Sequence, residues 1–367
     1  MPAQVTNYKC PACTGPLHFV GASGRLECDY CGSNYSVAEI EARMREAEAK
    51  AAEAYEHAQA NGDGWDTSML ENEWGDEAEN LRAYNCPSCG AELICDVTTA
   101  ATSCPYCNNP TVVPGQLSGV LKPDYVIPFR YSKEQAIDAL NKHYKGKPFL
   151  PKEFTDKNHI EEIKGVYVPF WLFDGVADAD IEFDGRITHT RRSGNYEITT
   201  TEHYQIIRSG SVGFSHVPVD ASTKMPDDHM DSIEPYDYAD MRPFSISYLP
   251  GFLADKFDVS AADCAPRADI RCKNSVIESL RETVSGYTSV VLQHEDVQLH
   301  RGNVKYALMP VWMLNTKWKD NTFLFAMNGQ TGKIVGDLPI SKGKWWATFG
   351  AIAAPIAAAL AAILFFL

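Results

Sequence analysis

The stretch that decides the fold is Cys86-Pro87-Ser88-Cys89, followed fourteen residues later by Cys104-Pro105-Tyr106-Cys107. The same spacing occurs earlier in the chain, in Cys10-Pro11-Ala12-Cys13 and Cys28-Asp29-Tyr30-Cys31. Each copy reads C-x2-C-x14-C-x2-C. This pattern is typical of two knuckles that place four thiolates around one tetrahedral Zn²⁺ at about 2.3 Å.

Residues that tolerate a left-handed backbone follow the second cysteine of three pairs, namely Gly32, Gly90 and Asn108. Such a turn lets backbone N–H groups point at sulfur. The alternatives are a set of disulfides, which needs an oxidising compartment, and an iron site of rubredoxin type, which normally spans a longer gap. We predict two structural zinc ions, with these ligands: Cys10, Cys13, Cys28, Cys31, Cys86, Cys89, Cys104 and Cys107. Four thiolates leave no open position for substrate, so neither site is predicted to be catalytic.

Length and cysteine content indicate the class of protein. A chain of 367 residues is long enough for two or three domains. Residues 1–8 lack the basic and apolar parts of a secretory signal. Eleven cysteines without such a signal indicate a reducing cytosol, where thiols bind metals.

The C-terminal segment predicts a membrane anchor. Residues 345–367 carry no charge, and as a helix they would span roughly 34 Å, against about 30 Å of hydrocarbon. Trp345 and Trp346 stand where an interfacial aromatic pair belongs, just after Lys342 and Lys344. We therefore predict a single-pass tail anchor in the cell membrane, with the body on the cytoplasmic side.

Small residues recur every fourth position in this segment, at Gly350, Ala354, Ala358 and Ala362. Such a stripe favours helix packing, either between copies in a homo-oligomer or with a partner helix. An alanine-rich span also produces such stripes by chance.

The order of composition and motifs predicts six regions and an α+β fold, in which a mixed body contains an antiparallel sheet. The regions are zinc ribbon 1 at 1–35, a charged Ala/Glu-rich helix at 36–64, an acidic linker at 65–84, zinc ribbon 2 at 85–118, the body at 119–341 and the anchor at 342–367. Aromatic side chains in the linker, such as Trp65, either dock on a partner or pack on the chain's own body.

Within the body, local signals predict several elements. Ser132 and Gln135 form a capping box for a helix that ends near Lys145. A second helix is expected over 261–284, with Cys264 and Cys272 buried as small apolar residues. Alternation at 177–183 and 196–206 predicts a hairpin, and 323–327 with 333–335 predicts another. Pro-containing apolar strands at 168–173 and 309–314 resemble each other and indicate an internal duplication, with the prolines at sheet edges or strand beginnings.

Five stretches resemble one group of bacterial membrane-anchored proteins with two zinc ribbons of TFIIB type, some of which are labelled as primosomal helicase relatives. They are CPSCGAEL at 86–93, TSCPYCNNP at 102–110, PDYVIPF at 123–129, GVYVPFWLF at 165–173 and FAMNGQTGKIVGDLP at 325–339. The resemblance implies a membrane adaptor in a membrane-stress system, with flotillin-like or phage-shock-type proteins as partners. The chain contains no helicase motif, and no motif of the P-loop, metalloprotease or serine hydrolase classes.

The charge of the chain weighs against nucleic acid as a partner. The formal net charge is −15, the stretch 36–84 has 13 acidic against 4 basic residues, and zinc ribbon 2 has no Lys or Arg. We predict a membrane-tethered cytosolic scaffold that recruits protein partners and is not an enzyme. The alternatives are a zinc-ribbon nucleic-acid binder and an enzyme with an unrecognised site in 119–341.

Overall fold

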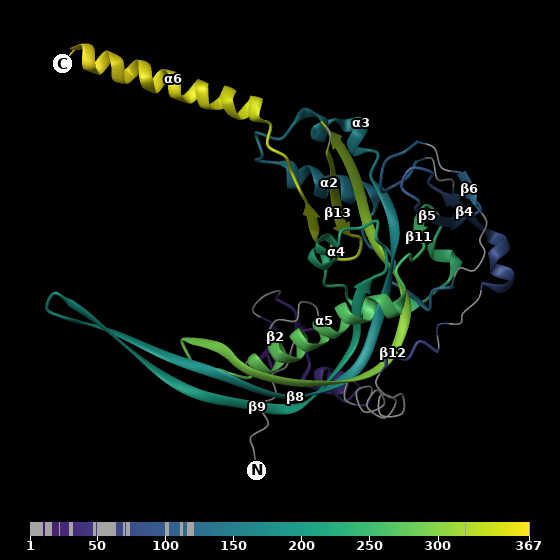
Figure 1. Cartoon of the computed structure of the whole chain (residues 1–367), viewed down its shortest axis with the longest axis horizontal. Coiled ribbons are helices and arrows are strands. Elements are labelled where there is room, and N and C mark those ends of the chain that lie inside the picture. The colour runs from purple at the N-terminus through teal and green to yellow at the C-terminus, as the bar shows by residue number, and fades with distance from the viewer. Residues whose placement is uncertain are drawn as a thin grey trace. The chain divides into compact units, whose positions relative to one another are not determined.

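The computed structural model is drawn in Figure 1. It describes residues 10–11, 17–21, 23–28, 32–46, 49, 64–68, 70, 74–99, 103–110, 113–115, 121–319 and 321–366. The chain divides into two compact units. Unit 1 comprises Met1–Glu71, Trp171–Val219 and Val259–Tyr306, and unit 2 comprises Asn72–Phe170, Asp220–Asp258 and Ala307–Leu367. The domain boundaries predicted from the sequence stay predictions.

The described strands form two hydrogen-bonded sheets. The small sheet has the order β1-β2-β3, with β1 at Leu17–Val20, β2 at Arg25–Cys28 and β3 at Asn34–Tyr35. The large sheet contains β4 (Leu81–Asn85), β5 (Glu92–Asp96), β6 (Val113–Gly115), β7 (Tyr125–Val126), β8 (Lys164–Ser193), β9 (Tyr196–Asp220), β10 (Arg242–Pro243), β11 (Leu253–Asp255), β12 (Ser289–Trp318), β13 (Asn321–Asn328) and β14 (Ile334–Gly336). The helices are α2 (Lys133–Tyr144), α3 (Lys157–Ile160), α4 (Asp227–Ile233), α5 (Ala261–Arg281) and α6 (Lys342–Phe366).

The pairing of the large sheet corrects the predicted fold class. Its main order is β10-β7-β12-β8-β11-β5-β4-β6; β9 pairs with β8, and β13 with β12 and β14. Strands β11 and β8 are parallel, as are β12 and β7, so parallel pairs join the antiparallel ones of the sheet and the body is mixed α/β. Alternation within one strand shows which face is buried, but it does not indicate the direction of a neighbour that is distant in sequence.

Several local predictions are confirmed. Ser132 and Gln135 form both hydrogen bonds of the capping box at the start of α2. Helix α5 begins after Ser260, which caps it, and it buries Cys264 and Cys272. Both predicted hairpins are present, as β8 with β9 and as β13 with β14. These elements were predictable because their signals lie within a few residues of each other.

The prolines of the repeated apolar stretches are not at strand beginnings, contrary to the prediction. Pro169 lies within β8 and Pro310 within β12. Each carbonyl accepts a backbone hydrogen bond, from Ala221 at 2.9 Å and from Gly329 at 2.8 Å. Proline lacks only the donor, so it fits a position where the ladder uses its carbonyl alone.

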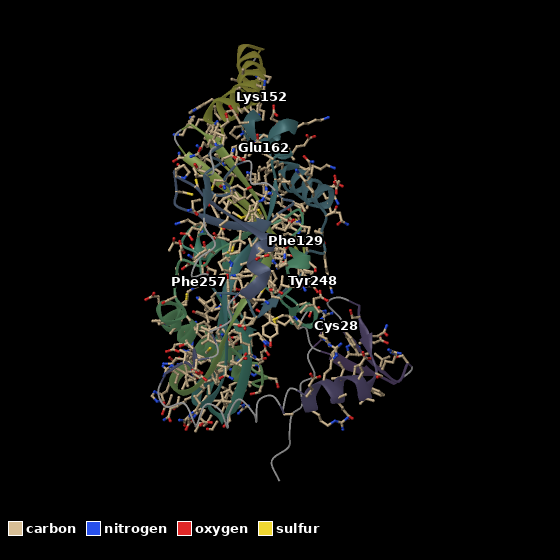
Figure 2. All side chains as sticks on the ribbon, turned by 90° about the vertical axis from the view of Figure 1, so that its right-hand side faces the viewer. Cys28, Phe129, Lys152, Glu162, Tyr248 and Phe257 are labelled. Carbon is tan, nitrogen blue, oxygen red and sulfur yellow. The ribbon has the colours of Figure 1, made fainter. Side chains whose placement is uncertain are left out.

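The core of unit 2 is aromatic. Phe129, labelled in Figure 2, stacks on Phe252 at 4.1 Å between ring centroids and meets the rings of Tyr167 and Trp312 edge-on. Gly329 contacts the same ring, since a Cβ there would lie 2.6 Å from Phe129. The motif at 325–339 is therefore built into this core as a tight turn.

The core of unit 1 lies between α5 and one face of β8, β9 and β12 (Figure 1). Its buried members include Ile181, Phe183, Ile206 and Val276. Trp65 packs on the chain's own body. Its ring is 4.8 Å from that of Phe173, and its indole N–H donates to Asp269 at 3.0 Å.

The predicted membrane anchor is contradicted by the structure. Among the described residues, no helix is long and apolar enough to cross a membrane. Helix α6 runs over Lys342–Phe366, and its side chains are described as far as residue 357. This finding overturns the transmembrane helix of the predicted fold class and the single-pass membrane localisation.

Gly302 on β12 lies so close to the neighbouring strand β8 that a substitution there tests the packing of unit 1. A Cβ at Gly302 would lie 2.5 Å from the backbone oxygen of Asp174 on β8. Because a backbone atom cannot rotate away, we expect Gly302→Ala to lower the free energy of unfolding by about 1–3 kcal/mol in urea titrations. Gly210→Ala on β9, where no heavy atom lies within 4 Å, is the matched control and should change it little. Equal effects of the two substitutions would contradict the assigned contact.

Candidate metal centre

The candidate centre is built by two turns of the second ribbon, which belongs to unit 2. Strand β4 leads into Cys86, and β5 begins three residues after Cys89. The turn with Cys104 and Cys107 follows β5. Strand β5 pairs antiparallel with both β4 and β11, so the first turn is held between strands of the large sheet.

The four sulfur atoms lie together. Their ligand atoms are all within 4.8 Å of one another, with Cys86 to Cys107 at 3.5 Å and Cys89 to Cys104 at 3.6 Å between Sγ atoms. None of the described cysteines forms a disulfide. Four sulfurs at about 2.3 Å from one tetrahedral ion would be about 3.8 Å apart, close to these separations. The cluster could therefore hold a metal ion.

The backbone at the turns has the predicted left-handed residues. Gly90, Asn108 and Gly32 have φ of 72°, 57° and 72°. The N–H of Gly90 donates to the carbonyl of Cys86 at 2.9 Å, and that of Asn108 to the carbonyl of Cys104 at 3.1 Å. The two halves of the second centre therefore repeat one local geometry, and the first ribbon repeats it after Cys28, where Gly32 donates at 2.9 Å.

The first ribbon is described only in part. Cys10 and Cys28 are buried in one small apolar cluster with Leu17, Leu26 and Ile40. Cys13 and Cys31 lie outside the described residues, so the first predicted zinc site stays a prediction.

Local donors favour the thiolate form of Cys86, whereas burial disfavours it at two other cysteines of the second centre. Burial raises the pKa of the Cys86 thiol, but the backbone N–H groups of Cys89 and Ser88 and the neighbouring thiols lower it to about 7. Burial raises the pKa of Cys89 and of Cys104 above the ordinary value. A bound cation would offset that burial penalty, because a metal ligand must be deprotonated.

Residues far away in sequence hold the second ribbon in place, and sequence reasoning missed them. The Tyr106 hydroxyl, inside the second knuckle, donates to the Asp255 carboxylate at 2.7 Å, and Ser222 donates to the same oxygen at 2.7 Å. Asp255 is only 2 % exposed. Lys164 donates to the carbonyl of Ser103 at 2.9 Å, and the Asn315 amide donates to the carbonyl of Pro105. The one available signal was the tyrosine between Cys104 and Cys107.

Two lysines bring positive charge to the sulfurs. Lys164 interacts electrostatically with Cys104 and Cys107, and Lys224 with Cys89. Four thiolates around a divalent ion leave an excess of two negative charges, which two ammonium groups would balance. Lys224 also pairs with Asp258 at 3.1 Å and lines a cavity of about 190 Å³ beside Gly90, Asp255 and Lys256.

The remaining described cysteines and the residues of the predicted anchor are not part of this centre. Cys95, Cys264 and Cys272 are buried apart from the four-cysteine cluster. Trp345, Trp346, Gly350 and Ala354 lie on α6, whereas the side chains of Ala358 and Ala362 lie outside the described residues.

Comparison with known proteins gives one informative relative. No family model matches the chain, and no solved structure matches it. The chain is 33% identical over 355 residues to the "Uncharacterized protein YdjG" of Bacillus subtilis (strain 168), an alignment that covers 95% of each chain. Identity at this level along nearly the whole length means that the chain belongs to the same protein family as this Bacillus subtilis protein.

Proposed function

We propose that Cys86, Cys89, Cys104 and Cys107 bind a structural Zn²⁺, and that the protein is a scaffold that recruits protein partners. The observation that carries the proposal is the closed set of four thiolates within 4.8 Å, which leaves no ligand position for water or substrate. All four ligands are sulfur, which suits zinc, although iron accepts the same geometry.

The ribbon's connections to the sheet support a structural role. Three hydrogen bonds link the second ribbon to the large sheet. The Tyr106 hydroxyl donates to Asp255 on β11, and two carbonyls of the ribbon accept from Lys164 on β8 and Asn315 on β12. A metal ion that orders the ribbon therefore also fixes the side chains of these strands that form hydrogen bonds with the ribbon. This is what a zinc site contributes to a scaffold, since metal binding and folding are coupled in small metal domains.

The charges around the ribbon favour protein over nucleic acid. The accessible lysines beside it are paired, Lys224 with Asp258 and Lys256 with Glu92 at 2.8 Å. Phosphate binding needs cations that are not already neutralised by carboxylates. A scaffold that takes flotillin-like or phage-shock-type proteins as partners fits this surface better than a nucleic-acid binder.

The test uses the zinc-loaded full chain in two titrations at about 0.15 M salt. Labelled single- and double-stranded oligonucleotides should show no binding below about 10 µM, because the chain carries a net charge of −15 and Lys224 and Lys256 beside the ribbon are paired with carboxylates. A purified flotillin-like or phage-shock-type protein from the same organism should bind, and binding should weaken when the metal is removed. Salt-sensitive oligonucleotide binding at submicromolar concentration would favour the nucleic-acid alternative. No binding of either kind would contradict the scaffold.

A further inference from the structure

Strands β8 and β9 continue into a two-stranded arm, residues Thr188–Tyr204, which ends in the turn at Gly194 (Figure 1). Every residue of the arm is exposed. Strand β12, which also pairs with β8, begins only at the base of the arm. Just before it, the N–H of Thr288 donates to the carbonyl of Arg186 at 2.7 Å. Among the described residues, β9 pairs with β8 and with no other strand.

An arm of this kind is poorly stable alone. Two-stranded hairpins are marginal in water, because they have neither a third strand nor a core. The outer edge of β9 also presents a row of backbone donors and acceptors that another strand can pair with. Between Tyr196 and Ile206 this edge carries no proline and no lysine, the residues that usually block such pairing.

One face of the arm carries its large apolar side chains, together with Thr200 and Glu202. Hydroxyl contacts of Thr188 with Thr201 at 3.4 Å and of Thr190 with Thr199 at 3.3 Å align the two strands. Even-numbered residues of β9 therefore share a face with the buried Ile206. On that face Tyr196 is 77% exposed, Ile198 38% and Tyr204 40%.

Charge indicates which partner fits the arm. The chain as a whole is at −15, so two copies repel each other over most of their surface. The arm itself has two arginines, Arg191 and Arg192, and two glutamates, Glu197 and Glu202. Because these four charges cancel, two arms do not repel each other as the rest of the chain does. The arm also lacks the excess of basic residues that binding to a phosphate backbone needs.

We propose that the free edge of β9 pairs antiparallel with β9 of a second copy, with Thr200 at the two-fold axis. In this register Tyr196 of one copy lies opposite Tyr204 of the other, and Glu197 lies opposite His203. Aromatic pairs, such as Tyr196 with Tyr204, are among the cross-strand pairs that stabilise antiparallel strands. In this register the even-numbered β9 residues of one copy lie opposite even-numbered β9 residues of the other. The large apolar side chains of both arms therefore lie on the same side of the joined sheet.

Sedimentation velocity of the full chain tests the interface. A chain of 40.7 kDa should sediment as a dimer at micromolar concentration. Thr200→Lys places two like charges at the axis and should raise the dimer dissociation constant at least tenfold. His189→Lys is the matched control, because His189 lies opposite Thr200 on β8, one strand away from the interface; it should change the constant less than threefold. A wild-type monomer at 50 µM, or equal effects of the two lysines, would overturn the proposal.

Cysteine cross-linking tests the register. Under mild oxidation Thr200→Cys should form a covalent dimer on non-reducing gels, since only the residue at the axis meets its own copy. Thr199→Cys should not, because its opposite residue is Thr201, and the wild-type chain treated in parallel accounts for the native thiols. Cross-linking of Thr199→Cys equal to that of Thr200→Cys would contradict this register.

Discussion

Replacing Cys89 with serine is expected to remove one metal ion per chain and to unfold the second ribbon. Serine is a poor ligand for zinc, and three remaining thiolates bind it far more weakly than four. Metal binding supplies on the order of 10 kcal/mol to the folding of small zinc domains, so the loss is large. It should spread beyond the ribbon, since the Tyr106 hydroxyl would leave the buried carboxylate of Asp255 with one donor fewer.

Elemental analysis of the purified chain measures this effect directly. With both predicted ribbons loaded, the wild-type chain should carry two zinc ions and Cys89→Ser one. Cys95→Ser is the control, because Cys95 is buried on β5 in the same ribbon but lies outside the cluster. Its sulfur donates to the carbonyl of Thr99 at 3.2 Å, a bond that a serine hydroxyl can replace. Wild-type protein that carries iron, or fewer than about one zinc per chain, would contradict the zinc assignment.

Asp255→Asn is expected to stabilise the protein at neutral and higher pH. Burial raises the pKa of Asp255 to about 7, and the donors Ser222 and Tyr106 only partly offset this. The ordinary pKa of an aspartate is about 3.9, so between roughly pH 4 and 7 the folded state binds a proton that the unfolded state has lost. The contribution of Asp255 to stability is therefore fully present below pH 4 and is lost as pH rises through 7.

A pKa of about 7, against the ordinary value near 3.9, means that the ionised Asp255 lowers the free energy of unfolding at pH 8 by at most about 4 kcal/mol. Asparagine has the shape and donor pattern of the neutral acid, so its carbonyl can accept from both hydroxyls at any pH. Urea unfolding of the zinc-loaded chain between pH 6 and 8 should show the wild-type free energy falling by about 1 kcal/mol, and no such fall in the variant.

Asp258→Asn serves as the contrasting control in the same cavity. Burial acts to raise the pKa of Asp258, but hydrogen bonds from Thr223 and the charge of Lys224 lower it overall. Its charged form is the stabilising one, and its neutralisation should destabilise the chain at pH 8. Glu92 and Lys256 line this cavity too, and both variants leave them unchanged. An identical pH dependence in wild type and Asp255→Asn would show that Asp255 stays ionised in the fold.

Local spacing predicted the second cluster of four cysteines well. The interval between Cys86 and Cys89 and the left-handed residue at Gly90 are both set within one turn. The same holds for the capping box at Ser132 and for the hairpin at Gly194. In each case the interacting groups are so close in sequence that the rest of the fold cannot separate them.

The C-terminal prediction, which rested on the uncharged run at 345–367 and its expected length as a helix, is wrong. An uncharged run shows which solvent a helix prefers, whereas a membrane span also needs a defined apolar length in the structure. Among the described residues, no helix meets that requirement.

The sequence by itself determined the cluster of four cysteines, the capped helices and the tight hairpins, because these depend on contacts within about 20 residues. Only the tertiary structure decided that β11 and β8 run parallel and that Tyr106 meets Asp255, 149 residues further along the chain. It also decided that Lys164 and Lys224 flank the sulfurs of a ribbon that has no basic residue of its own. Pairings over such distances follow from the packing of the whole sheet, and no short pattern in the chain encodes them.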